Sequence, residues 1–168
     1  MLKDDIFTDD SPTTSTDYET ERNKPMPNRI HGTIQTKISV MLTIEFGDKY
    51  DFPNEVTLAT TPASTPDICI FPKRELDWAT TEAKEQEVPI TTIEIVSPSQ
   101  SLDEMAKTIW QTYFPIGVQS AWIVMPPPFK AIYILTPDGG KHFFDQGTLT
   151  DAATGVELEV EKVFEGLK

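Results

Sequence analysis

The segment from Pro89 to Met125 contains a strand, a helix and a second strand, and this order constrains the fold more than any other feature. Pro89–Val96 is rich in β-branched residues and predicts a buried strand. Ser97-Pro98 interrupts it, and the Ser-x-x-Glu spacing at 101–104 predicts a capping box that starts a helix. Val118–Met125 predicts the next strand. Strands connected through a helix usually pair in parallel by a right-handed crossover, so we expect a parallel pair within a sheet.

The segments on either side complete a mixed sheet. Apolar residues at spacings of three and four predict a helix over Asn28–Gly47. Further strands are expected at Phe52–Ala59, Asp67–Phe71, Lys130–Leu135, Lys141–Phe144 and Gly155–Val160. The last of these would end the sheet before a short helical tail, and Thr136–Gly140 predicts a hairpin turn. A charged loop, Pro72–Val88, would be anchored by Trp78. We therefore expect an α/β fold, with a mixed β-sheet flanked by helices and a largely antiparallel edge.

Composition limits the organisation and the partners of the chain. Its 168 residues suffice for one core, which we place at residues 26–168, whereas residues 1–25 are rich in polar residues and predict a mobile arm. The net charge of −13 and the pI near 4.4 oppose non-specific attraction to nucleic acid or to an anionic membrane. One cysteine excludes an internal disulfide. No apolar run approaches membrane-spanning length and no signal peptide is evident, so we expect a cytoplasmic protein.

Two acidic residues stand where the predicted strands should be apolar. Asp67 begins one strand after Thr65-Pro66, and Glu94 lies inside another. Burying a lone ionised carboxylate is costly, but two carboxylates on neighbouring strands can converge on one cation. Two acids with open positions suit Mg²⁺, with Mn²⁺ as a substitute. The alternatives are a glutamate that faces solvent or an arginine, and an aspartate that caps the turn before its strand.

A longer ordered set of motifs accompanies these two acids. It consists of Pro66-Asp67-Ile68, Ile93-Glu94-Ile95-Val96-Ser97-Pro98-Ser99, Lys107, Tyr113, Gly117-Val118 and Trp122-Ile123-Val124. The set resembles the Uma-type putative restriction endonuclease family, a branch of the PD-(D/E)XK nuclease superfamily. The similarity reaches back through His31 into the first predicted helix and covers roughly residues 18 to 165.

The resemblance implies a restriction endonuclease-like core and a function. Asp67 and Glu94 would hold Mg²⁺ with the carbonyl of Ile95 as a third ligand, and activated water would hydrolyse DNA phosphodiester bonds. A homodimer would supply two sites for two strands. The superfamily's usual lysine follows the glutamate by two residues, where this chain has Val96. The resemblance implies that Lys107, on the following helix, takes that role. The alternatives are a solvated helix lysine and a partner for Asp103 at i−4.

Three further residues are candidates for lining the site. His31 near the start of the first helix, Glu55 in the strand before Asp67, and Tyr113 at the end of the second helix all carry polar groups. Ordinary structural roles compete for each of them, namely a capping histidine, an exposed strand glutamate and a core tyrosine. Two rival functions also stay open. One is a non-catalytic binding or regulatory module that keeps the fold, favoured by the acidity and the lack of a basic stripe. The other is hydrolysis of RNA or another phosphate ester.

Overall fold

The structure is a computed structural model and describes residues 25–168; the arm expected at residues 1–25 lies outside this range except for its last residue. Its centre is a six-stranded sheet in which the strands stand side by side in chain order. These strands are β1 (Tyr50–Asp51), β2 (Ile68–Pro72), β3 (Thr91–Ile95), β4 (Ser120–Met125), β5 (Ala131–Leu135) and β6 (Lys141–Phe144). Only β3 and β4 pair in parallel, and all other neighbours are antiparallel. The expected mixed sheet with its parallel pair is therefore confirmed.

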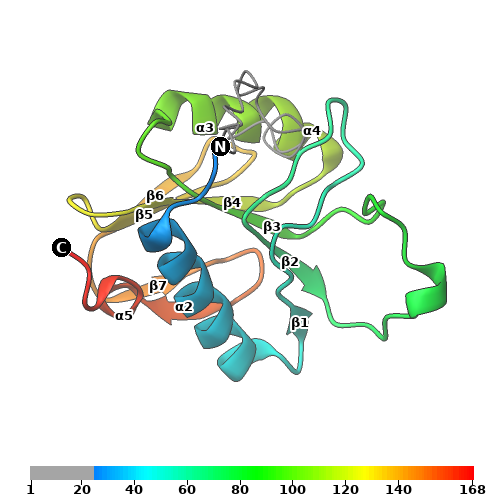
Figure 1. Cartoon of the computed structure of the whole chain (residues 1–168), viewed down its shortest axis with the longest axis horizontal. Coiled ribbons are helices and arrows are strands. Elements are labelled where there is room, and N and C mark those ends of the chain that lie inside the picture. Colours follow the sequence, from blue (N-terminus) through cyan, green and yellow to red (C-terminus); the bar gives the residue numbers. More distant parts are fainter. Residues whose placement is uncertain (1–24) are drawn as a thin grey trace, which may run out of the picture.

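One face of the sheet is covered by the crossover between β3 and β4 (Figure 1). It begins with α3 (Leu102–Thr108), which has the predicted capping box of Ser101 and Glu104. A π-helical segment, η2 (Ile109–Tyr113), follows, and then α4 (Phe114–Ile116). Gly117 ends the crossover with a φ of 109°, a left-handed conformation that glycine adopts without strain.

The other face is covered by α2 (Arg29–Phe46), by α5 (Val160–Phe164) and by a small second sheet. Asn28 caps α2, because its side-chain oxygen accepts a hydrogen bond from the backbone N–H of His31, and asparagine is a preferred residue at this position. The small sheet pairs β7 (Thr148–Thr150) with β8 (Glu157–Glu159). The molecule thus has three layers, with helices above and below the central sheet in Figure 1.

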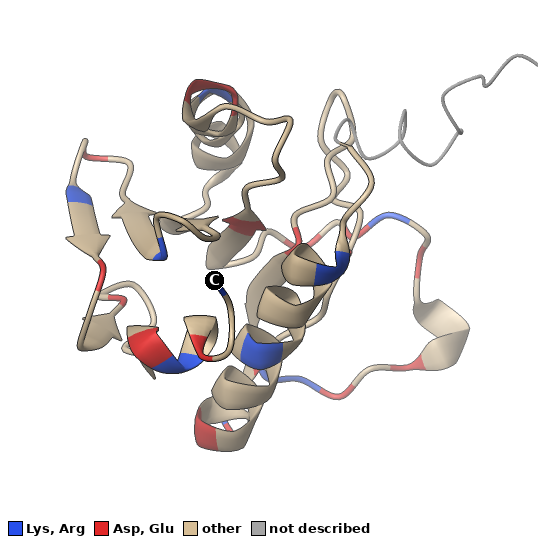
Figure 2. Ribbon diagram, turned by 60° about the vertical axis from the view of Figure 1, so that its left-hand side comes forward, with Lys and Arg blue, Asp and Glu red and all other residues tan. Residues whose placement is uncertain are grey.

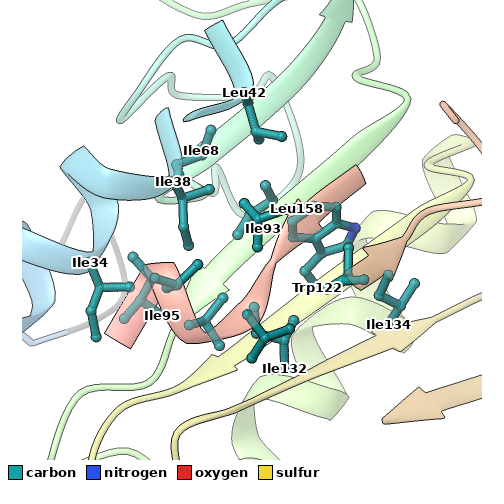
Figure 3. Close-up of a cluster of buried hydrophobic side chains, with 14 of the residues drawn as sticks. Ile34, Ile38, Leu42, Ile68, Ile93, Ile95, Trp122, Ile132, Ile134 and Leu158 are labelled. Atoms are coloured by element: carbon teal, nitrogen blue, oxygen red, sulfur yellow. The ribbon is translucent and has the colours of Figure 1, made fainter. Parts of the chain in front are cut away.

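The alternation of side chains along the strands separates two apolar cores. In β3, Ile93 and Ile95 face α2, and Trp122 of β4 belongs to the same core. Figure 3 shows Ile95 near Ile34 and Ile93 near Ile38 of the helix. The second core lies under the crossover and includes the alternate residues Cys69 of β2 and Ile123 of β4. Because the period of a strand is two, Glu94 lies on the face opposite to Ile93 and Ile95, toward the crossover helices.

A buried carboxylate joins the small sheet to the large one. Asp151 follows β7 and is only 1% exposed. Its Oδ2 accepts hydrogen bonds from Ser120 Oγ (2.7 Å) and Trp122 Nε1 (2.8 Å), both on β4. Thr91 Oγ1, at the start of β3, also donates to it at 3.2 Å. Asp151 therefore anchors the β7–β8 sheet at the N-terminal ends of the parallel pair.

Three expectations about local structure are wrong. Phe52–Ala59 is not a strand, because Pro53 lacks a backbone N–H and Glu55 adopts a left-handed φ of 59°, which leaves only isolated bridges. The strand at the C-terminal end pairs with β7, which the sequence did not indicate, and so does not extend the main sheet. Trp78 anchors nothing, since it is 93% exposed on a short 3₁₀ helix, η1 (Trp78–Thr80).

Candidate active site

Asp67 and Glu94 lie opposite each other at one end of the sheet. In the antiparallel pairing of β2 with β3, Ile68 faces Ile93, so the next step of the register places Asp67 across from Glu94. Both are buried, with exposed fractions of 0% and 3%. Like charges on facing strand positions repel and buried carboxylates are costly, so this pair opposes stability unless other groups compensate.

Asp67 is held by donors from two different elements. Its Oδ2 accepts a hydrogen bond from the backbone N–H of Ile95 at 2.7 Å. His31 Nε2, on the first turn of α2, lies 3.1 Å from the same oxygen, and its ring is 3% exposed. A neutral His31 that donates through Nε2 would stabilise the ionised form of Asp67 and keep the carboxylate in one orientation. The structure thus brings the predicted lining residue His31 into direct contact with Asp67.

Glu94 is held from the opposite layer by Tyr113. The hydroxyl of Tyr113 donates to Glu94 Oε1 at 2.5 Å. Burial raises the pKa of Tyr113 well above its usual value, and the negative charge of Glu94 raises it further. Tyr113 closes the π-helical segment, and such segments often occur at functional sites. The tyrosine predicted as a lining residue therefore contacts the site as a firmly protonated donor.

Gln35 is a site residue that our sequence reasoning missed. Its Nε2 donates to the carbonyl of Asp67 at 2.8 Å and to Glu55 Oε1 at 3.1 Å. The backbone N–H of Glu55 also donates to the Asp67 carbonyl, at 3.1 Å. Gln35 follows His31 by four residues and so shares its helix face, which was the available signal. Gln35 therefore links the predicted candidate Glu55 to the backbone of Asp67 through two hydrogen bonds donated by its side-chain amide.

Lys107 is not brought into this hydrogen-bonded group. Its side chain is exposed, and no hydrogen bond or ion pair joins it to another of the described residues. Met105, two residues earlier, is buried against the sheet, and two residues rotate a helix by about 200°. Lys107 therefore starts from the solvent side of α3. Its catalytic role, like that of the Ile95 carbonyl, stays a prediction.

The side chains of the site include few of the groups that can act as metal ligands. Within residues 25–168, no group of three or more His, Cys, Asp and Glu side chains is arranged to hold a metal. Mg²⁺, however, is usually held by one or two carboxylates and completes its shell with water and substrate phosphate. Asp67 and Glu94, buried on one face and each fixed by a donor, fit that requirement. Oxygen ligands of this kind favour Mg²⁺ or Mn²⁺ over Zn²⁺.

The arrangement of a mixed sheet flanked by helices is that of a restriction endonuclease-like fold, the fold of a class of nucleases. Residues 16–168 match the Uma2 family, described as putative restriction endonuclease, and the chain belongs to this family. A crystal structure from Anabaena variabilis ATCC 29413, titled a putative nuclease belonging to DUF820, is similar with a TM-score of 0.71 and 21% identity over 83% of each chain. No curated protein matches the sequence. Membership in this family supports a nuclease that acts on nucleic acid.

None of the helices in residues 25–168 combines the length and the apolar character needed to cross a bilayer.

Proposed function

We propose that this protein is a Mg²⁺-dependent endonuclease that hydrolyses DNA phosphodiester bonds, with Mn²⁺ able to replace Mg²⁺. The observation that carries the proposal is the placement of two buried carboxylates, Asp67 and Glu94, opposite each other on neighbouring strands. A fold that only needed stability would gain by replacing such a pair with apolar residues. The carbonyl of Ile95, which follows Glu94 on the same strand, is the third proposed ligand.

The side chains around the two acids have the task of keeping them ionised and oriented. His31 and the backbone N–H of Ile95 restrain Asp67 through one carboxylate oxygen, and Tyr113 restrains Glu94 through Oε1. A divalent cation supplies two things to phosphodiester hydrolysis, because it makes water a better nucleophile and offsets negative charge at the reacting phosphate. Restraint of both acids before the substrate arrives removes a reorganisation cost from the reaction.

Lys107 is proposed to stabilise the developing negative charge or to position the attacking water. Its place in the chain sequence supports this role, since it follows Glu94 on the next helix. A lysine side chain on α3 leans back toward the N-terminus of the helix, which adjoins the end of β3. Replacement by arginine would keep the charge, and replacement by methionine would remove it. Cleavage that survives Lys107→Met unchanged would remove Lys107 from the mechanism.

A second function is favoured by the surface charge. The net charge is −13, and Lys and Arg are few and scattered among acidic positions on the described ribbon (Figure 2). A surface of this kind gives weak non-specific attraction to a polyanion. The alternative is therefore a non-catalytic binding or regulatory module that keeps the nuclease fold.

A homodimer, which would supply two sites for a double-strand cut, is part of the catalytic proposal.

The deciding experiment is a cleavage assay with the full chain on plasmid DNA, single-stranded DNA and RNA, with Mg²⁺, with Mn²⁺ and with chelator. We expect cleavage of DNA that needs the metal and that falls about 1,000-fold or more in Asp67→Asn. Asp145→Asn is the matched control, because it removes a carboxylate from an exposed turn after β6. Absence of cleavage on all three nucleic acids by the wild-type chain would favour the non-catalytic module, and preferential cleavage of RNA would correct the substrate.

A further inference from the structure

A pocket of about 480 Å³ adjoins the two acids at the same end of the sheet. Val96, which follows β3, and Met125, the last residue of β4, both line it, so it lies at the carboxyl ends of the parallel pair. In open sheets with parallel strands, ligands bind at this edge. His31 belongs to both places, because it lines the pocket and its Nε2 contacts Asp67. A ligand in the pocket would therefore lie directly beside the proposed reaction centre.

The walls of the pocket are mostly apolar and partly open to solvent. Phe129, in the turn between β4 and β5, is 68% exposed, and Ile30 and Leu102 are exposed to 38% and 39%. Pro126, Pro127 and Pro128 complete the same wall. Exposed aromatic and proline faces beside a cavity are surfaces on which a flat ring can stack. The chemistry of the lining residues suits a planar group that can stack on them.

A small number of polar groups stand in this apolar setting. The buried Nδ1 of His31 has no hydrogen-bond partner among the described residues. When Nε2 donates to Asp67, the neutral ring leaves Nδ1 as an acceptor. Gln100 Oε1 accepts from the backbone N–H of Ser97, and Asn28 Oδ1 accepts from that of His31, so each of these side chains has its amide nitrogen as the remaining donor. The lining residues therefore include two side-chain amides, of Gln100 and Asn28, whose nitrogens take no part in these two hydrogen bonds.

The charge of the pocket differs from that of the rest of the molecule. None of the described residues that line it is Asp, Glu, Lys or Arg. A second pocket, along the loop between β2 and β3, is instead lined by Glu82, Glu85 and Glu87 among other charged residues. With a net charge of −13 for the chain, most of the surface repels a phosphate backbone. Besides the proposed Mg²⁺, a contact that does not depend on positive charge would then contribute to the affinity for a nucleic acid.

We propose that this pocket binds one unpaired nucleobase of the substrate strand, next to the phosphodiester bond that faces Asp67 and Glu94. A base is flat, uncharged and carries donors and acceptors at its edge, which matches the walls and the polar groups described above. The inference rests on the proposed nuclease function and adds to it a substrate class. Because a base in a duplex is stacked and paired, the preferred substrate is single-stranded or locally unpaired nucleic acid.

The test is a binding measurement made with the full chain in chelator, so that cleavage does not interfere. Three fluorescently labelled DNA probes of equal length are compared by anisotropy, namely a single strand, a duplex, and a single strand whose bases are replaced by abasic sites. Base stacking on protein aromatic groups is worth about 1–3 kcal/mol, so we expect the normal single strand to bind about tenfold or more tightly than the other two. Phe129→Ala should reduce its binding to the abasic level.

Two variants serve as control and as second probe. Phe143→Ala removes another exposed aromatic side chain, on β6, and should leave binding unchanged. Leu102→Trp fills the pocket from its half-exposed rim and should remove the preference for bases as Phe129→Ala does. Melting temperatures of all variants establish that they fold.

Equal binding of the normal and abasic strands, tighter binding of the duplex than of the single strand, or equal effects of Phe129→Ala and Phe143→Ala would each overturn the pocket proposal. These outcomes are separate from the cleavage assay. A chain that cleaves duplex DNA and ignores bases keeps the nuclease function and loses the pocket. A chain that binds bases through Phe129 but never cleaves keeps the pocket and loses the nuclease function.

Discussion

Buried carboxylates lie at both ends of β3, and the surroundings that compensate the cost of burying their charge differ between the two ends. At the start of the strand, one carboxylate, Asp151, accepts hydrogen bonds from Thr91, Ser120 and Trp122 through the same oxygen. At its other end, Glu94 faces a second carboxylate, Asp67, across the β2–β3 pairing. The first arrangement spreads one charge over several neutral donors, and the second brings two charges together.

This difference separates an acid that supports the fold from acids placed for chemistry. Buried carboxylates gain about 1.5–3 kcal/mol for each good hydrogen bond from neutral donors, so the site of Asp151 compensates its own burial. Asp67 and Glu94 repel each other although hydrogen-bond donors hold each of them, and a bound cation would offset this repulsion. Removing charge should therefore harm the first region and relieve the second.

The largest effect is expected for Glu94→Gln. Glutamine keeps an oxygen that can accept the hydrogen bond from Tyr113 but removes the charge. We expect DNA cleavage to fall about 1,000-fold or more, while the melting temperature stays equal or rises because repulsion with Asp67 is lost. Cleavage rates and thermal denaturation in metal-free buffer measure the two parts. A large fall in melting temperature would make Glu94 a structural acid like Asp151.

Asp151→Ala should have the reverse profile. The change leaves buried donors of Ser120 and Trp122 without their acceptor, and we expect a loss of about 3 kcal/mol in the free energy of unfolding. Denaturant titration measures it. Asp151→Asn is the matched variant, since it retains an acceptor oxygen and should lose less. The activity of the folded fraction at low temperature should change little, and unchanged stability of Asp151→Ala would contradict the role given to this residue.

Metal binding should distinguish the two regions with a somewhat smaller effect. At a Mg²⁺ concentration 100 times its dissociation constant, a site present only in the folded state adds about 2.7 kcal/mol to stability. We expect a rise in melting temperature with Mg²⁺ in the wild-type chain and in Asp151→Asn, and none in Asp67→Asn or Glu94→Gln. Differential scanning fluorimetry over a Mg²⁺ series gives the answer. An equal rise in all four chains would mean that the metal binds elsewhere.

The smallest effect is expected at high pH, and it comes from Tyr113. Burial and the charge of Glu94 raise its pKa in the folded state, so the unfolded chain loses this proton first as the pH rises. The stability linked to the protonated tyrosine is therefore complete below about pH 10, the ordinary tyrosine value, and declines above it. Tyr113→Phe removes the titration. Its free energy of unfolding should decline less steeply than that of the wild type above pH 10, and parallel curves would contradict the shift.

Much of the architecture could be predicted from local patterns. Several local patterns each predict one type of secondary structure, and each prediction is confirmed. These patterns are the β-branched runs of β2 and β3, the capping box of Ser101 and Glu104, and the apolar stripe of α2. The order strand, helix, strand then requires the parallel pair of β3 with β4. Because β2 pairs with β3, Asp67 and Glu94 stand across from each other, which is the condition that the sequence analysis set for a shared cation; their role as ligands stays a prediction.

The remaining features depend on contacts between segments that are distant in the chain. The region after β1 looked like a strand by composition, but Glu55 turns it into a bend whose N–H joins Asp67. Gln35 looked like one polar residue on a helix until Asp67 and Glu55 were placed beside it. β7 has one buried residue, Leu149, between two exposed threonines, and no pattern in the nearby sequence indicates its pairing with β8.

The π-helical segment Ile109–Tyr113 makes the position of Tyr113 sensitive to the insertion or deletion of a single residue. A π-helical turn holds about one residue more than an α-helical turn, so it is the structural equivalent of an insertion. Deleting one residue, such as Gln111, would let α3 continue as regular helix and rotate everything before it by about 100° relative to Tyr113. The hydroxyl could then meet Glu94 only if α3 turned away from its core. Evolutionary gain or loss of a single codon here would be a switch between a restrained and an unrestrained Glu94.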